Sequence, residues 1–349
     1  MKKSLRFLFT ALKWLVLAAV AVEVFCFLIV TASNYLIYGH YWEGSRVRYD
    51  PYALFLNDDG PRPTAHNPAH PGPAHRTIWM FGGSTMRSDS GRVDATIPSY
   101  LAAILNRPGS PYPCTVVNFG ENSFNALMET KYLQKLLVEE PAPPDLVIFY
   151  DGANDCTYFA QHRTPYGHYG YRRLRAAIEN YRHSFFGLLK PLNAALYSSF
   201  TKELYDKMMQ VAVPLEPDAP ELRTLAAVTA KRYEHVRKLA GCYGAAFLLI
   251  WQPILWVETG AVAPQIREQE QKYSIQGERF LSVRHNFTVV YEAMAESLKD
   301  KPYFINFRNV LCPRSQPVYE PDGVHLKAAG DEMVAQDLGR ILQERWPQK

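Results

Sequence analysis

Apolar residues form one long run near the N-terminus and, further along, short runs that alternate with amphipathic stretches. The long run, Trp14 to Ala32, contains one charged residue, Glu23, and has the length of a helix that spans a bilayer. Four basic residues and no acidic one precede it. Because positive charge stays on the cytoplasmic side, we expect a membrane anchor over residues 14–32, with the remainder of the chain outside the cytoplasm.

A cleaved signal peptide is the alternative for this segment, since Val30-Thr31-Ala32 resembles a small-residue cleavage site. The apolar run is longer than the core of a usual signal peptide, which favours the uncleaved anchor. A charge inside such a helix is costly. We therefore expect Glu23 to be protonated, to snorkel towards the interface or to bond to a partner.

Residues 39–76 contain six prolines, a density that blocks regular structure and favours an extended spacer. We predict a linker here. Three of its histidines, His66, His70 and His75, have no thiolate or fixed scaffold beside them, so we interpret them as solvated side chains rather than metal ligands.

Beyond the linker, five compact apolar runs predict buried strands of a parallel sheet. They are Thr77–Phe81, Val116–Phe119, Leu146–Tyr150, Ala246–Leu255 and Tyr303–Val310. Between them, apolar residues recur at helical spacing over 222–240 and 280–298. Strands that alternate with amphipathic helices indicate an α/β fold.

Residues 157–219 do not fit this alternation, because they are rich in aromatic residues and lack a strand pattern. We predict a mainly helical insertion, which either packs internally or forms a lid over the site. The expected organisation is a basic stub and anchor over 1–38, a linker over 39–76 and an α/β domain over 77–349.

Composition narrows the possible partners. The 349 residues are 48% hydrophobic and carry a formal net charge of +4, with a pI near 8.6. This is enough apolar material for one large α/β core. No run of lysine and arginine is interleaved with aromatics, so we expect no nucleic-acid partner. The sequence does not indicate an oligomeric state.

The loops that follow the predicted strands carry the candidate chemistry, because the carboxyl ends of parallel strands meet at one edge of a sheet. Ser84 follows two glycines after the first strand, in a turn that can present a hydroxyl group at a helix N-terminus. Glycine-rich turns also bind phosphate. The spacing and the lysine of a P-loop are absent, which argues against that alternative.

The next two loops supply hydrogen-bond donors. Gly120 ends Asn118-Phe119-Gly120, where a backbone N–H can approach a ligand closely. In Asp151-Gly152-Ala153-Asn154-Asp155, Asn154 has an amide suited to a developing oxyanion, and Asp155 is placed to brace the loop. Taken alone, each loop is equally consistent with a simple turn.

The last loop pairs Asp322 with His325, three residues apart before the final helix. A carboxylate at that spacing can fix the tautomer of the imidazole and stabilise its protonated form, which makes His325 the candidate base for Ser84. On its own this pair also fits a surface turn or half of a metal site.

Together, the segments FGGST, NFG, YDGAND and DGVH resemble the ordered blocks of the SGNH/GDSL hydrolase superfamily, over residues 76–345 and in a membrane-anchored bacterial type. The resemblance implies a flavodoxin-like three-layer α/β/α sandwich with a five-stranded parallel sheet. It also implies a nucleophile, Ser84, and a base, His325, which Asp322 orients. The implied oxyanion hole comprises the N–H groups of Ser84 and Gly120 and the side chain of Asn154.

Two residues do not fit this pattern simply. Gly83 stands where the name of the family has aspartate. Glu121 follows the proposed donor Gly120, and a carboxylate turned inwards would oppose an oxyanion, so we expect it to point to solvent. If the fold is as implied, Cys156 and Cys312 both follow strands at the active-site edge. A disulfide between them and a set of buried free thiols remain alternatives.

The expected function is that of a serine-dependent ester hydrolase that forms an acyl-enzyme and needs neither cofactor nor metal. The expected setting is the bacterial inner membrane, with the N-terminus cytoplasmic and the catalytic domain periplasmic. This location favours an acylated glycan or lipid of the cell envelope as substrate. The alternatives are an O-acyltransferase that uses the same serine, and a non-catalytic module that binds glycan or serves envelope assembly.

Overall fold

The computed structural model of the chain describes residues 2–38, 47–70, 72, 75–88, 91–108, 113–183, 196, 199–211, 213–273 and 281–345. Parts of the predicted insertion, residues 184–195 and 197–198, lie outside them. The chain divides into two compact units. The first comprises Met1–Glu43 and Gly170–Val213, and the second comprises Gly44–Tyr169 and Pro214–Lys349.

The first unit contains three described helices: α1 (Lys2–Tyr38), α6 (Tyr171–His183) and α8 (Phe200–Val211). Within α1, Leu5–Ala32 is long and apolar enough to cross a membrane, with a mean hydropathy of 2.7. The predicted span 14–32 lies inside this range. A signal sequence near an N-terminus can meet the same criteria of length and composition, so the helix is a candidate anchor.

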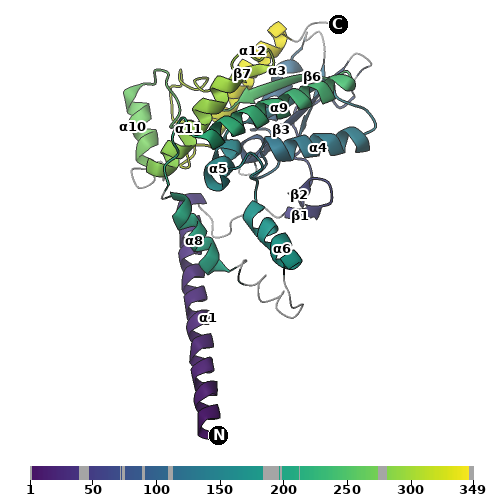
Figure 1. Cartoon of the computed structure of the whole chain (residues 1–349). Helices are drawn as coiled ribbons and strands as arrows, with labels where there is room; N and C mark the ends of the chain where they lie inside the picture. The colour runs from purple at the N-terminus through teal and green to yellow at the C-terminus, as the bar shows by residue number, and fades with distance from the viewer. Residues whose placement is uncertain are drawn as a thin grey trace. The chain divides into compact units, whose positions relative to one another are not determined.

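The second unit is built on a parallel sheet with the strand order β4-β3-β5-β6-β7 (Figure 1). Its strands are β3 (Arg76–Gly82), β4 (Cys114–Asn118), β5 (Leu146–Asp151), β6 (Ala246–Trp251) and β7 (Phe304–Asn306). Numbered from 1 to 5 in chain order, the strands of this sheet lie in the order 2-1-3-4-5, which is that of the flavodoxin-like, doubly wound fold. The predicted α/β class and the five-stranded sheet are therefore confirmed.

Helices cover both faces of the sheet because side chains alternate along each strand. On β3, Trp79 and Phe81 pack in one core cluster, while Ile78 and Met80 pack in the other. The first face is covered by α4 (Ala126–Glu139), α9 (Pro220–Cys242) and α11 (Leu281–Leu298). The second is covered by α3 (Ile97–Leu105) and α12 (Ala328–Arg345).

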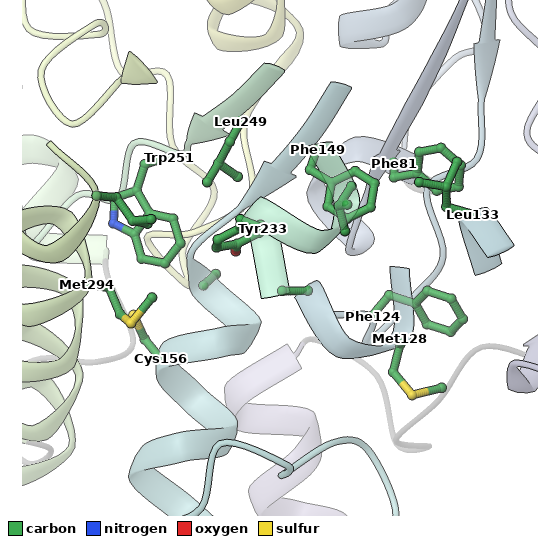
Figure 2. Close-up of a cluster of buried hydrophobic side chains, with 14 of the residues drawn as sticks. Phe81, Phe124, Met128, Leu133, Phe149, Cys156, Tyr233, Leu249, Trp251 and Met294 are labelled. Carbon is green, nitrogen blue, oxygen red and sulfur yellow. The ribbon is translucent and has the colours of Figure 1, made fainter. Parts of the chain in front are cut away.

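Figure 2 shows the larger core cluster, in which aromatic and sulfur-containing side chains fill the space between the sheet and its helices. Phe81 lies within 5.4 Å of the Phe119 ring and 5.2 Å of the Phe149 ring. Trp251, at the end of β6, is fully buried. This packing fixes the strand ends from which the candidate site projects.

Three short helices follow strands: α2 (Ser84–Arg87) after β3, α5 (Ala153–His162) after β5 and α10 (Pro264–Tyr273) after β6. The predicted strands Ala246–Leu255 and Tyr303–Val310 are shorter in the structure, ending at Trp251 and Asn306. The loop after β6, residues 252–255, is itself buried, whereas after β7 Phe307 is buried and Asn309 is exposed. In both cases hydrophobicity alone placed the strand end too late.

The predicted linker is not a free spacer over residues 47–70. This segment contains an antiparallel hairpin, β1 (Val47–Asp50) and β2 (Leu54–Asn57), and belongs to the second unit. Further along it, the Asn67 side chain accepts from the Val116 N–H and donates to the Val116 carbonyl, both at 2.8 Å. Prolines suppress helix and strand, but they do not prevent side-chain bonds of this kind.

The predicted insertion also has different limits. Residues 157–169 and 214–219 belong to the second unit, whereas Gly170–Val213 groups with the N-terminal helix. Phe159, on α5, is buried in the main core. All five cysteines are free thiols, so the Cys156–Cys312 disulfide is absent. Four of the thiols are buried and Cys242 is exposed.

Candidate active site

Ser84 opens α2 directly after β3, in a turn where a side chain at either preceding glycine would crowd its neighbours. A Cβ on Gly82 would lie 2.6 Å from Cβ of Met86, and a Cβ on Gly83 would lie 2.4 Å from Nδ2 of Asn154. Both separations are shorter than real Cβ contacts allow. The Gly-Gly pair therefore lets β3 turn sharply into α2 and brings Ser84 close to the Asn154 loop.

The structure brings Ser84, His325 and Asp322 into one chain of hydrogen bonds. Nε2 of His325 lies 2.7 Å from Oγ of Ser84, and Nδ1 of the same ring bonds to Oδ2 of Asp322. The second Asp322 oxygen accepts from the N–H groups of Val324 and His325, each at 2.9 Å. The spacing Asp-x-x-His is thus a tight turn that pairs the two side chains.

The turn that carries this pair is fixed by its backbone. Gly323 has φ of 69°, and a Cβ there would lie 2.5 Å from the Trp256 ring. Its carbonyl accepts from the Leu255 N–H at 3.0 Å, and the Glu320 N–H donates to the His325 carbonyl at 2.8 Å. The left-handed φ and the close ring explain why glycine stands between Asp322 and His325.

The electrostatics of the pair suit a base that works near neutral pH. Burial alone would lower the pKa of His325, but its hydrogen bond to Asp322 and the charges of Asp322 and Glu320 raise that pKa above its ordinary value. Burial would raise the pKa of Asp322, but the bonds it accepts from His325 and from two backbone N–H groups lower it. Asp322 thus remains an anion beside the imidazole.

The three proposed oxyanion donors differ in what they already bind. Nδ2 of Asn154 donates one hydrogen to the Phe124 carbonyl at 2.7 Å and keeps a second. The Gly120 N–H donates to Oδ1 of Asn118 at 2.9 Å. Among the described residues, no hydrogen bond uses the N–H of Ser84. Gly120 would have to give up its present acceptor to serve an oxyanion.

Ser123 was not among the residues that the sequence singled out. It has φ of 64°, a strained conformation for a residue with a side chain. It precedes Phe124, whose carbonyl binds Asn154. Within the described part of the chain, no hydrogen bond uses its N–H. The sequence carries no signal for this conformation, because serine does not mark a left-handed residue as glycine does.

The expectation that Glu121 points to solvent is wrong, since its side chain is 1% exposed. Oε2 accepts from the Asn57 N–H at 2.8 Å, and Oε1 lies 3.9 Å from Nη1 of Arg87. Arg87 also reaches Asp59 at 2.5 Å and the Gly60 carbonyl at 2.9 Å. The hairpin segment thus holds the Glu121 carboxylate beside a guanidinium.

Three carboxyl groups in and beside the Asn154 loop are buried: Glu129 on α4, Asp151 at the end of β5 and Asp155 on α5. Oη of Tyr233 donates to Oδ2 of Asp151 at 2.8 Å, and Oδ1 of Asp155 accepts from the Ala126 N–H at 3.3 Å. The hydrogen bond from Ala126 is consistent with the expected role of Asp155 in bracing the loop.

Burial and the charge of Asp151 raise the pKa of Glu129 and that of Asp155 well above their ordinary values. Burial also raises the pKa of Asp151, against the effects of the neighbouring Glu129 and of the hydrogen bond from Tyr233. Three carboxylates this close cannot all ionise, so the group shares protons near neutral pH. Local sequence pattern does not indicate Glu129, because its neighbour Asp151 is distant in the chain.

A buried ion-pair network holds the segment before His325. The Arg314 guanidinium donates to both oxygens of Glu258, at 2.9 and 3.0 Å, and to Oε2 of Glu270. Oη of Tyr319 donates to Glu258 at 2.7 Å.

Among the described residues, no group of three or more histidine, cysteine or acidic side chains is arranged to hold a metal ion.

Solved structures similar to this chain include members of the GDSL family. A lipolytic G-D-S-L family protein from Veillonella parvula DSM 2008 is 13% identical, with a TM-score of 0.38. The alignment covers 78% of this chain and 99% of that one. TesA is 18% identical, with a TM-score of 0.39 and coverages of 77% and 99%.

The acetyl xylan esterase AlAXEase is 14% identical, with a TM-score of 0.40 and coverages of 76% and 99%. No family model matches the sequence, and no curated protein matches it. At such identities and TM-scores, the fold is assigned from the strand order of this chain and the site from its own hydrogen bonds.

Proposed function

We propose that this protein is an SGNH-type serine hydrolase that cleaves esters through an acyl-enzyme. The observation that carries the proposal is the chain of hydrogen bonds from Ser84 through His325 to Asp322. A serine hydroxyl bonded to an imidazole that a carboxylate orients is the arrangement that activates a nucleophile. A structural turn has no need of all three groups.

The mechanism has two halves. Oγ of Ser84 attacks the ester carbonyl carbon while Nε2 of His325 takes the hydroxyl proton, and the carbonyl oxygen becomes an oxyanion that the N–H of Ser84 and the free hydrogen of Asn154 stabilise. When the tetrahedral intermediate collapses, His325 returns its proton to the leaving alcohol. The acyl group is then bonded to Ser84.

Water resolves the acyl-enzyme by the same steps in reverse. His325 takes a proton from the water, the hydroxide attacks the acyl carbon, and Ser84 leaves with the proton as the free acid forms. If the acceptor is a sugar hydroxyl, the same residues transfer the acyl group instead. The candidate membrane span supports an envelope glycan or lipid ester as substrate, and the two neighbours described as lipolytic and as an acetyl xylan esterase are consistent with such esters.

The test uses the full-length protein in detergent with a fluorophosphonate probe and short aryl acetates. We expect the probe to label wild-type protein, and Ser84→Ala to lose labelling and roughly 10⁴-fold of the ester turnover. Ser297→Ala, on α11, is the matched control and should retain both. Equal activity of wild type and Ser84→Ala would exclude the mechanism. Product analysis with and without an acceptor sugar then separates hydrolysis from transfer.

A further inference from the structure

Glu23, the one charged residue in the apolar run of α1, binds the N-terminus of α8 within the first unit. Its carboxylate accepts from the Phe200 N–H at 2.5 Å and from the Thr201 N–H at 3.2 Å. It also accepts from Oγ1 of Thr201 at 2.7 Å. Glu23 therefore satisfies two of the N–H groups that the first turn of a helix leaves without partners.

Glu23 lies on a seam along α1. Cys26 and Val30 are buried, although most of α1 is exposed, and the Phe27 ring lies 4.9 Å from that of Phe200 with an edge-on geometry. Positions 23, 26, 27 and 30 follow the spacing i, i+3, i+4 and i+7, which places them on one helix face. The contact with α8 is therefore a packed face.

This pairing satisfies two kinds of group whose cost is largest away from water. A carboxylate in an apolar helix is costly in a bilayer, and unsatisfied N–H groups at a helix end are costly there as well. In water, solvent would satisfy both at little cost. The mutual pairing of Glu23 with the start of α8 therefore points to a site of low polarity.

The exposed surface around this contact is apolar. On α8, Tyr205 and Met208 are each more than half exposed, and so are Leu196 before the helix and Val213 after it. Glu203 lies on another side of α8 from Tyr205, since successive residues turn by about 100°. Lys202 lies at the edge of the apolar surface, with Nζ 5.7 Å from the centre of the Tyr205 ring. On α1, the exposed neighbours of the seam are Val24, Phe25 and Leu28.

We propose that α8 is an interfacial helix that rests in the outer leaflet of the bilayer crossed by α1, with Glu23 as its cap and with Tyr205 and Met208 against lipid acyl chains. The apolar surface of α8 continues the lipid-facing surface of α1, which identifies lipid as the occupant. An amphipathic helix with charged residues on one side suits the lipid–water boundary. The proposal depends on α1 spanning the membrane, and it is independent of the ester chemistry.

One consequence concerns processing of the chain. Cleavage after Ala32 would remove Glu23, Cys26, Phe27 and Val30, and with them the cap and the packed face of α8. The mature protein should therefore keep α1, so its intact mass should include residues 1–32. A mass that begins at residue 33 would overturn the proposal.

The main test places a single fluorophore on the full-length protein in lipid vesicles. Cys242 is first changed to serine because it is the exposed thiol, and Met208→Cys or Tyr205→Cys is labelled with a polarity-sensitive dye. Lipids that carry a shallow spin label should quench both positions by at least about twofold, since interfacial helices bury their apolar face 5–10 Å deep. Thr224→Cys, exposed on α9 of the second unit, is the matched control and should not be quenched.

Quenching at 205 and 208 no greater than at 224 would overturn the proposal, as would crosslinking of 208 to a second copy or to another protein in place of lipid contact. The cap has its own readout. In vesicles, Glu23→Ala should speed amide hydrogen exchange over 199–203 by about fivefold, and Glu23→Gln should partly restore protection. Unchanged exchange in Glu23→Ala would contradict the capping role. Ester turnover by the same samples keeps this outcome separate from failure of the proposed function.

Discussion

His325 depends on Asp322 for its charge as well as for its orientation. The raised pKa of His325 means that the ring loses its proton, and so becomes a base, at higher pH than an unperturbed histidine, near 6.5. Ester turnover should therefore rise with pH through a value above that. The folded state gains stability from the protonated ring below the unfolded pKa and loses this gain as pH rises through the folded value.

Asp322→Asn tests this dependence. Without the carboxylate, the pKa of His325 should fall, because burial is then opposed only by the charge of Glu320. The acid limb of kcat/KM should move to lower pH while kcat drops by about 10²–10⁴-fold, since the wrong tautomer is no longer excluded. Measurement of the pH profile with an aryl acetate decides the matter. An acid limb that stays in place would show that another group sets it.

Glu129 is the second residue whose protonation carries a prediction. Because its folded pKa is raised, the folded chain binds more protons than the unfolded chain between the two pKa values, and stability declines as pH rises across that interval. Glu129→Gln keeps the shape and removes the ionisation, so its unfolding free energy should fall less between pH 6 and 9 than that of wild type. Glu129→Ala should cost about 2–3 kcal/mol at pH 6 and less at pH 9, because it removes the same ionisation. If the unfolding free energies of Glu129→Gln and wild type fall equally between pH 6 and 9, the shared-proton interpretation is wrong.

At the scale of elements, the turn between β3 and α2 is the part of the site that leaves the least space for an added side chain. In Gly83→Ala, the new Cβ would displace the Asn154 amide, 2.4 Å away, from its position beside Ser84. Loss of an oxyanion donor typically costs 10²–10³-fold in kcat, and we expect a loss of about that size with a smaller effect on KM. Gly241→Ala, on α9 with open space around it, should leave kcat unchanged.

The sequence predicted the elements that position the site better than the bonds that hold it. Buried parallel strands are continuous apolar runs, and each of those at the site ends in glycine or a polar turn, so Ser84, Asn154 and His325 could be placed at one sheet edge. The orientation of Glu121 could not be predicted. Its partner Arg87 is 34 residues earlier, and local pattern carries no information about such a pair. Glu23 and Thr201 are 178 residues apart.

For the whole molecule, residues 47–70 belong to the second unit and bond to its sheet and helices. A fragment that begins at residue 44 keeps Asn57, Asp59 and Asn67, whereas one that begins at 76 removes their bonds to Glu121, Arg87 and Val116. The shorter fragment should be less stable by at least about 3 kcal/mol, at roughly 1 kcal/mol for each lost bond. Chemical denaturation of the two fragments, which both lack α1, measures the difference. Equal midpoints would restore the spacer interpretation.

Two asparagine side chains beside β4 affect how readily molecules of this protein associate through their sheets. β4 is an edge strand, and an edge strand normally offers unpaired N–H and carbonyl groups to another chain. Asn67 occupies both backbone groups of Val116, and Asn106 occupies both of Cys114, at 2.7 and 2.9 Å. These side-chain amides act as a substitute sixth strand. They close this side of the sheet to edge-to-edge aggregation without adding a strand.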